Sequence, residues 1–317
     1  MGSRGSSGGF DEALQEVYHE VPYDNRHGYR ENFLGIEVKL PTINVIDDAS
    51  KINGSNEHWI PYEHFSIVNY IPRKLALVTA SNVNFNEDDQ RPEPGKDYRR
   101  KALTGVSGAE GWFRDPRIPL DEQLPDVFYT EDRSAFQKGH IVRRNDVTFG
   151  QNYEQVRRAN GDTYHLTNCS PQVPSFNQHG LWAKLEKAIG RQGEDEKYCV
   201  FAGPVFARHD RLFQGTGDNG PITVKIPRRY WKVVVARKDD KLESFAFVLK
   251  QSFRGVRFRE FDVRSRQLRN EMISIPDLEE LLKHRIKFPV DVRDADQIDS
   301  QRGREFREFH VLARYTP

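Results

Sequence analysis

The chain has 317 residues, of which 37% are hydrophobic and 30% are charged, and its formal net charge is +1. A chain of this length can bury a large core, and the sequence contains no apolar run of the roughly eighteen residues that a membrane-spanning helix needs. The first residues, MGSRGSSGGFDEALQE, lack the apolar segment of a secretory signal. We therefore expect a cytoplasmic protein with no membrane partner.

The only two cysteines, Cys169 and Cys199, are expected to be reduced and buried, because the chain shows no export signal. Basic residues gather over 225–268, and acidic residues over 84–94 and 291–299. A basic face of a near-neutral protein can bind a polyanion, but solvated strand faces explain the same charges equally well.

The predicted elements begin with a Gly/Ser-rich leader. Leu14, Val17, Tyr18 and Val21 recur at helical spacing before Pro22, which predicts a short amphipathic helix over 11–21. We divide the chain into this flexible leader and short helix over 1–30 and a single domain over 31–317.

Apolar runs bounded by turn residues predict strands along the rest of the chain, at 33–41, 64–71, 74–84, 140–147, 163–170, 198–206, 222–227, 230–237 and 244–251. The second and third strands are close enough to form a hairpin. A long loop region rich in Pro, Gly and Asp is expected over 81–130. Helical spacing predicts a helix at 181–190, and further helices are expected at 153–162, which ends at Asn160-Gly161, and at 276–284, with Pro276 in its first turn. This order of elements indicates an α+β fold, with a mostly antiparallel central sheet flanked by helices.

Four polar residues in the middle of the chain suggest chemistry: His140, Asn168, Asn177 and Glu186. Mg²⁺ prefers oxygen ligands and keeps several waters, so one Asn oxygen and one Glu that holds a water are a reasonable contribution from a protein. A histidine that is not a metal ligand can accept a proton from an attacking water. These residue types therefore fit hydrolysis at a phosphate.

The blocks FQKGH, TNCSPQVPSFNQ and W..LE, in this order, resemble the DNA/RNA non-specific endonucleases of the ββα-metal type. The resemblance extends over most of residues 33–290. It implies a ββα-metal finger that carries the active site, within a mostly antiparallel α+β fold. It also implies a Mg²⁺-dependent endonuclease, with Mn²⁺ as a substitute metal, that leaves 5′-phosphate and 3′-hydroxyl ends.

The resemblance also implies roles for individual residues. His140 corresponds to the general base, and Asn177 to the direct protein ligand of Mg²⁺. Glu186 corresponds to the carboxylate that holds a metal-bound water, and Asn168 to an asparagine that orients the site. Lys138 stands where the family has a phosphate-contacting arginine.

The sequence departs from the family pattern at three points. Gln137 replaces an aspartate, which keeps hydrogen bonding but removes a charge. Lys138 replaces a planar guanidinium with a point charge. Asn177 and Glu186 are nine residues apart, one more than is usual, and we assign the extra residue to His179, before the predicted helix.

Other motifs favour structural roles. Residues 215–220 fit G-x-G-x-x-G, but the strand that follows them predicts a hairpin loop in place of a dinucleotide site. Residues 291–300 lack the Gly and Glu of a Ca²⁺ loop and predict a solvated acidic loop. His165 is predicted to be structural. Arg73 has equal claims to a phosphate contact and to a structural role.

The leading hypothesis is a non-specific endonuclease that acts on DNA and RNA. Two alternatives stay open: a nucleic-acid-binding module with a weakened active site, and a phosphodiesterase that acts on small nucleotides. Because such a nuclease would endanger its own cell, we expect an inhibitor, an activating partner or delivery of the protein elsewhere. Family members often form homodimers, which the sequence neither supports nor excludes.

Overall fold

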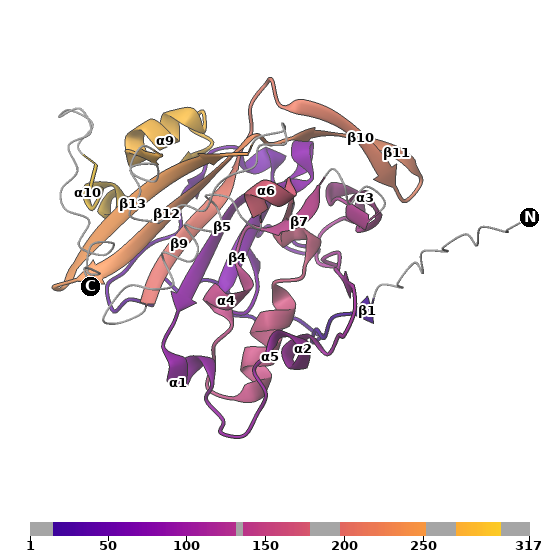
Figure 1. Ribbon diagram of the computed structural model, residues 1–317. Helices are drawn as coiled ribbons and strands as arrows, with labels where there is room; N and C mark the ends of the chain where they lie inside the picture. The colour runs from indigo at the N-terminus through magenta and orange to yellow at the C-terminus, as the bar shows by residue number, and fades with distance from the viewer. Residues whose placement is uncertain (1–14, 131–135, 178–196, 252–270, 299–317) are drawn as a thin grey trace, which may run out of the picture.

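The computed structural model describes residues 15–130, 136–177, 197–251 and 271–298 (Figure 1). Its centre is an antiparallel sheet of seven strands, which confirms the predicted α+β class. In spatial order the strands are β14 (Met272–Ile273), β13 (Lys241–Lys250), β12 (Arg229–Lys238), β9 (Lys197–Val205), β5 (Leu75–Asn84), β4 (Phe65–Tyr70) and β3 (Ile60–Pro61).

Local sequence explains the two main hairpins of this sheet. Strands β4 and β5 are buried along their whole length, as their apolar sequences predict, and Lys74 makes the turn between them with φ 54°. Strands β12 and β13 are joined by Asp239 and Asp240, which have φ 47° and 59°. Two successive residues with positive φ are typical of the tight turns that match the twist of a hairpin.

The sheet is covered on both faces, and two neighbouring residues of β12 show which helix covers each face. Tyr230 belongs to the apolar cluster that contains Phe176 of α6 (Pro174–Asn177). Trp231, the next residue, belongs to the cluster that contains Leu278 of α9 (Ile275–Leu281). Because successive side chains of a strand point to opposite faces, α6 and α9 pack on opposite sides of the sheet.

Four smaller two-stranded sheets surround the centre. A long ribbon extends away from the body in Figure 1 and includes the glycine motif at 215–220, which confirms the predicted hairpin. The pairs are β1 (Gln15–Glu16) with β6 (Glu110–Gly111), β2 (Thr42–Ile43) with β15 (Ile286–Lys287), β7 (Gln137–His140) with β8 (Cys169–Gln172), and β10 (Arg211–Gly217) with β11 (Gly220–Ile226).

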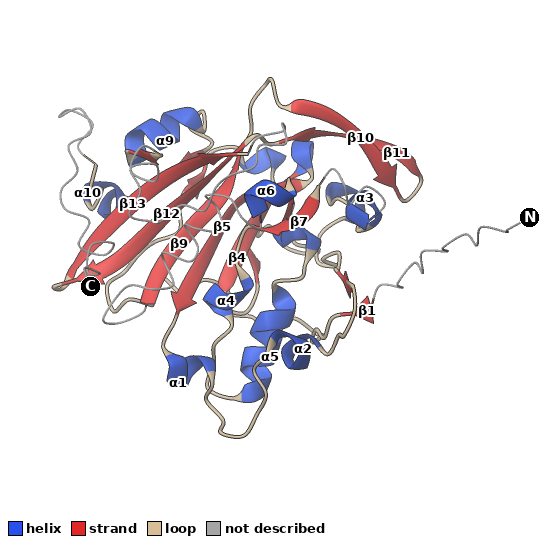
Figure 2. Cartoon of the chain, viewed as in Figure 1, coloured by secondary structure: helices blue, strands red, loops and turns tan. Residues whose placement is uncertain are grey.

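The helices are short and lie around the sheet (Figure 2). Helices α5 (Tyr153–Asp162) and α9 agree with the sequence predictions. Their first turns are well defined, because Asn152 caps α5 and Ser274 caps α9 ahead of Pro276. The remaining bounds are α1 (Glu87–Gln90), α2 (Arg100–Thr104), α3 (Val127–Thr130), α4 (Arg144–Val147) and α10 (Val290–Asp294), with 3₁₀ turns η1 (Ile46–Asp48), η2 (Ile71–Arg73), η3 (Leu120–Glu122) and η4 (Leu166–Asn168).

The N-terminal prediction was wrong over the described residues. Residues 15–21 form strand β1 and extended chain in place of a helix, and residues 15–30 pack onto the body. At Gly161 an added Cβ would lie 2.2 Å from the Tyr18 carbonyl oxygen. Arg26 and Asp162 form an ion pair at 3.0 Å, with both side chains fully buried. Tertiary contacts with α5 therefore override the helical spacing.

Two further predicted elements differ in the structure. The region 33–41 is a series of turns, because Val38 bonds back to Glu31 and the Tyr29 hydroxyl donates to the Val38 carbonyl. The predicted acidic loop at 291–300 begins with α10, whose Val292 is buried, so a packed helical turn replaces a solvated loop. The helix predicted at 181–190 lies outside the described residues.

Both cysteines are free and buried, as the sequence predicted. Burial raises the pKa of Cys169 and of Cys199 to about 12, so neither thiol is reactive near neutral pH. Among the described residues, no helix has the length and apolar character that crossing a membrane requires.

Candidate active site

The candidate site is built on the β7–β8 hairpin and on α6, which follows it. Gly139 pairs with Ser170, and His140 pairs with Cys169 at the end of β7. The prediction of strands at 140–147 and 163–170 was wrong in its bounds, because β7 and β8 begin and end elsewhere. Strand β7 ends at His140 and helix α4 begins at Arg144, while a 3₁₀ turn precedes β8.

Asn168 is the reason that the chain turns after His140. Its Oδ1 accepts from the Val142 N–H at 2.8 Å, and its Nδ2 donates to the carbonyls of Val142 and Thr163, each at 3.0 Å. The side chain is fully buried, and both of its polar atoms form hydrogen bonds within the protein. Asn168 thus fixes the backbone next to His140 without facing a ligand.

His140 lies among aromatic rings. Its ring centroid is 4.5 Å from that of Trp112, and the Tyr164 ring meets it edge-on at 5.5 Å. The His140 Nε2 is buried and has no hydrogen-bond partner among the described residues. Burial, together with the charges of Arg100, Arg144 and Arg143, lowers the pKa of His140 to about 3. The ring is therefore neutral at pH 7, with a nitrogen free to accept a proton.

Position 139 must be a glycine because the side chain of Gln172 lies too close to it for a Cβ atom to fit. A Cβ at this position would lie 2.3 Å from both Cδ and Oε1 of Gln172, which crosses the strand here. The amide of Gln172 is fully buried, and neither its oxygen nor its nitrogen has a hydrogen-bond partner in the described ranges. A buried amide without partners is costly in an ordinary core and is typical of a site that binds a ligand.

Asn177 ends α6 and lies beside β7. Its Nδ2 donates to the Gln137 Oε1 at 3.1 Å, and within the part of the chain that the structure describes no donor pairs with the Asn177 Oδ1. An amide oxygen of this kind suits a hard cation that keeps most of its waters. Within the described ranges there is no cluster of three or more His, Cys, Asp or Glu that could hold a metal. Glu186 and His179 lie outside those ranges.

Lys138 is engaged within the protein. Its Nζ forms an ion pair with the Asp126 Oδ1 at 2.5 Å and donates to the Glu110 carbonyl at 3.3 Å. The side chain is only 14% exposed. The residue at the position of the family arginine is therefore already paired with a carboxylate.

His165 and Arg73, for which the sequence offered a structural or a functional role, both make structural contacts. His165 is fully buried, and its ring bonds to the Tyr23 hydroxyl and to the Asp162 carbonyl, as a structural histidine should. Arg73 forms an ion pair with Asp210 at 3.0 Å and donates to the Ala207 carbonyl. Arg73 thus holds the turn after β9, and its guanidinium is used there.

Strand β8 is attached to the central sheet by two side chains. The Tyr230 hydroxyl donates to the Pro171 carbonyl at 2.9 Å and lies 2.9 Å from the Ser170 Oγ. Gln251 donates to the same carbonyl at 3.2 Å and accepts from the Val173 N–H at 2.9 Å. The candidate site therefore rests directly on β12 and on the residue that follows β13.

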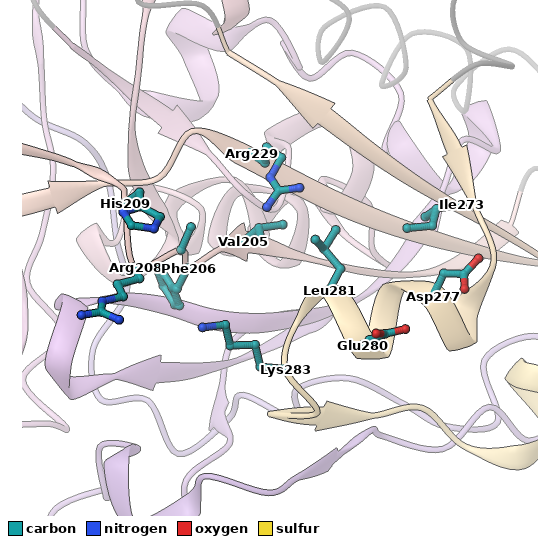
Figure 3. A pocket seen from close by; sticks show the side chains of 11 residues that line it. Val205, Phe206, Arg208, His209, Arg229, Ile273, Asp277, Glu280, Leu281 and Lys283 are labelled. Atoms are coloured by element: carbon teal, nitrogen blue, oxygen red, sulfur yellow. The ribbon is translucent and has the colours of Figure 1, made fainter.

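A cavity of about 590 Å³ lies elsewhere, between the turn after β9 and α9 (Figure 3). Arg208, Arg229 and Lys283 line it together with Asp277 and Glu280 of α9. It lies on the α9 side of the sheet and contains none of the candidate site residues, so it is separate from His140.

Several residues around His140 were missed from the sequence. Trp112 and Tyr164 supply the rings, Arg144 supplies charge, and Gln172 supplies the buried amide. Gln172 lies within the quoted block TNCSPQVPSFNQ and Arg144 lies four residues after FQKGH, so their positions were an available signal. Trp112 had none, because it comes from the long loop region before β7.

Comparisons with known proteins show the family to which the chain belongs. Residues 44–293 match the family described as DNA/RNA non-specific endonuclease. Uncharacterized protein y4fB of Sinorhizobium fredii is 35% identical over 244 residues, which cover 72% of this chain and 33% of y4fB. Nuclease C1 of Cunninghamella echinulata is 29% identical over 159 residues, or 44% of this chain and 57% of the relative. Human mitochondrial Endonuclease G is 29% identical over 112 residues, or 32% and 34% of the two chains.

A solved structure has a similar fold. The crystal structure of the EndoG/EndoGI complex contains a chain that aligns with a TM-score of 0.52 and 15% identity, covering 75% of this chain and 86% of that one. At this level of identity the similarity shows a shared fold. The chain belongs to the DNA/RNA non-specific endonuclease family. It spans about a third of y4fB and of human Endonuclease G, and rather more than half of Nuclease C1.

Proposed function

We propose that the chain is a metal-dependent endonuclease that hydrolyses phosphodiester bonds in DNA and RNA with little sequence preference. The observation that carries this proposal is the pairing of two unused atoms in one small unit. Among the described residues, neither the buried His140 Nε2 at the end of β7 nor the Asn177 Oδ1 at the end of α6 has a hydrogen-bond partner. Family membership supplies the substrate class.

In this proposal His140 accepts a proton at Nε2 from the water that attacks phosphorus. Its lowered pKa keeps the ring neutral, which is the form that a base requires. Asn168 holds the backbone that follows His140, and Trp112 and Tyr164 fix the plane of the ring. The reaction would leave 5′-phosphate and 3′-hydroxyl ends.

The Asn177 Oδ1 would hold Mg²⁺, with Mn²⁺ as a substitute, and Glu186 would hold one of its waters. Bound Mg²⁺ would stabilise the negative charge that develops on the phosphate and on the leaving oxygen. Gln137 orients the Asn177 amide by accepting from its nitrogen, so the oxygen stays available. The neutral Gln137 thus retains the acceptor function expected of the family aspartate.

A protein inhibitor is part of the proposal. The structural neighbour is EndoG in complex with EndoGI, from a study of EndoG inhibition. We propose that this chain, too, is controlled by an inhibitor that blocks access to the β7–β8 hairpin.

The test uses supercoiled plasmid DNA and single-stranded RNA, each incubated with Mg²⁺ or with EDTA. Wild type should cleave both polymers only with Mg²⁺, and His140→Ala and Asn177→Ala should not cleave. His209→Ala is the matched control, because His209 is an exposed histidine on the turn after β9. Intact polymers after incubation of folded wild type with Mg²⁺ would sink the proposal. Cleavage of a dinucleotide but not of a polymer would favour a small-molecule phosphodiesterase.

A further inference from the structure

The site lacks a free cation at the expected position. An arginine at the family position could form two parallel hydrogen bonds to a phosphate. Here Lys138 stands in its place, and Asp126 neutralises its charge at 2.5 Å. A phosphate that approached Lys138 would have to compete with this carboxylate.

Arg144, unlike Lys138, forms no ion pair with a carboxylate among the described residues. It is the first residue of α4, four residues after His140. Its Nη1 donates to the Asn160 Oδ1 at 3.1 Å, and no carboxylate in the described part of the chain pairs with it. Arg100, by comparison, donates to both carboxylate oxygens of Glu110. Among the arginines near His140, Arg144 keeps donors available for a ligand.

The position of Arg144 relates it to the proposed base. Asn160, which holds the guanidinium, lies in the last turn of α5, and Tyr164 follows this helix. The Tyr164 ring meets the His140 ring edge-on at 5.5 Å. Arg144 and His140 are therefore joined through one short segment of chain, and they are near enough for the arginine's charge to affect the imidazole.

Arg144 is the arginine of this cluster without a carboxylate of its own within the described ranges, because Arg100 pairs with Glu110 and Arg143 pairs with Asp146. Partial burial and the positive charges of Arg100 and Arg143 lower the pKa of Arg144, while Tyr164 and Glu110 act in the opposite direction. Packing several guanidinium groups around a neutral histidine costs free energy. A bound phosphate would offset that cost by supplying the missing negative charge.

We propose that Arg144, in place of Lys138, binds the non-bridging oxygens of the scissile phosphodiester beside His140. The inference rests on the proposed function and adds a phosphate-binding residue that lies outside the recognised motif. The guanidinium presents a planar pair of N–H donors to the phosphate, and its fixed charge stabilises the transition state. Asn160 positions the guanidinium by holding Nη1.

The binding test uses a duplex DNA oligonucleotide and proteins that carry His140→Ala, so that nothing is cleaved. Adding Arg144→Gln should weaken binding about tenfold, as expected for loss of a charged hydrogen bond. The slope of log affinity against log salt should become shallower by about 0.9, because one phosphate contact is lost. Arg144→Lys should keep the slope and lose part of the affinity. Arg208→Gln, an exposed arginine of the separate cavity, should change neither quantity.

The kinetic test uses proteins with His140 intact. Arg144→Gln should lower kcat at saturating DNA about 100-fold, as loss of a transition-state donor does, and Arg144→Lys should recover part of it. Lys138→Gln should lose less than Arg144→Gln. An unchanged salt slope and kcat in folded Arg144→Gln, or a larger loss in Lys138→Gln, would overturn the inference. Absence of cleavage by wild type would instead refute the nuclease proposal, while the binding slopes would still decide the role of Arg144.

Discussion

The Asn177 side chain donates its N–H to the Gln137 Oε1 at 3.1 Å, so a residue of β7 decides which way the amide of α6 points. Gln137→Ala removes the acceptor and lets the amide rotate. The Mg²⁺ concentration that gives half-maximal cleavage should rise about tenfold or more, as is usual when a partner of a metal ligand is lost. Gln137→Glu keeps the acceptor and should retain wild-type Mg²⁺ affinity or improve it. An unchanged Mg²⁺ requirement in Gln137→Ala would contradict this role.

Gly139→Ala should destabilise the protein by about 1–3 kcal/mol, because overpacking a filled site costs that much. The new methyl group would lie 2.3 Å from the Gln172 Cδ. The free energy of unfolding, measured in urea, should recover when Gln172→Ala is added. If the double variant is as unstable as the sum of the single variants, the clash with Gln172 is not the cause.

Arg26→Met should cost about 3–5 kcal/mol, because it leaves the buried carboxylate of Asp162 without its partner. Both side chains of this pair are fully buried. Arg91→Ala is the matched control. The exposed pair of Arg91 with Glu87 should contribute less than about 0.5 kcal/mol. Equal melting temperatures for the two variants would show that residues 15–30 are dispensable to the fold.

Acid should destabilise the protein through its buried histidines. Burial lowers the pKa of His64 to about 4 and lowers that of His165. Above pH 6.5 both rings are neutral in the folded and the unfolded chain, so they add no pH dependence. As the pH falls below 6.5 the unfolded chain binds protons first, and stability is lost down to about pH 4. For His64 the full loss is about 3 kcal/mol.

Urea unfolding at pH 7 and at pH 5 measures this loss. His64→Gln keeps a donor for the Phe149 carbonyl and should reduce the difference between the two pH values. His209→Gln, at an exposed position, should leave it unchanged. A wild type that is equally stable at both pH values would contradict the assignment.

Removing the charge of Arg144 should also change the pH profile of cleavage. A nearby cation lowers the pKa of a histidine, and Arg144 contributes to the lowered pKa of His140. In Arg144→Gln the pKa of His140 should rise, so the acidic limb of kcat/KM should shift to higher pH. Arg144→Lys keeps the charge and should keep the wild-type profile.

The sequence was informative where local signals and packing agree. The strands of the central sheet were predicted because β4, β5, β9 and β12 are rich in apolar residues and are buried over most of their length. Helix α5 has the predicted bounds, and the structure shows that Asn152 caps it. His140, Asn168 and Asn177 were found through the order of the motifs, and the structure brings all three to the β7–β8–α6 unit.

The errors arose where distant contacts decide the backbone. The run after His140 reads as a strand, yet the Asn168 side chain, 26 residues away, accepts from the Val142 N–H and ends the strand. Residues 15–21 have helical spacing, but Gly161 admits the Tyr18 carbonyl and holds the segment extended. The ring of Trp112 reaches His140 from a loop with no periodicity. No local sequence pattern predicts these contacts between distant residues.

The attachment of β8 to the sheet links the lifetime of the site to that of the whole fold. Tyr230 and Gln251 hold the Pro171 carbonyl from the central strands, so β8 cannot open alone without breaking both bonds. Amide hydrogens of the β7–β8 ladder should therefore exchange with solvent as slowly as those of β12. On heating, loss of cleavage should coincide with melting of the sheet, and storage lifetime should follow the rate of global unfolding.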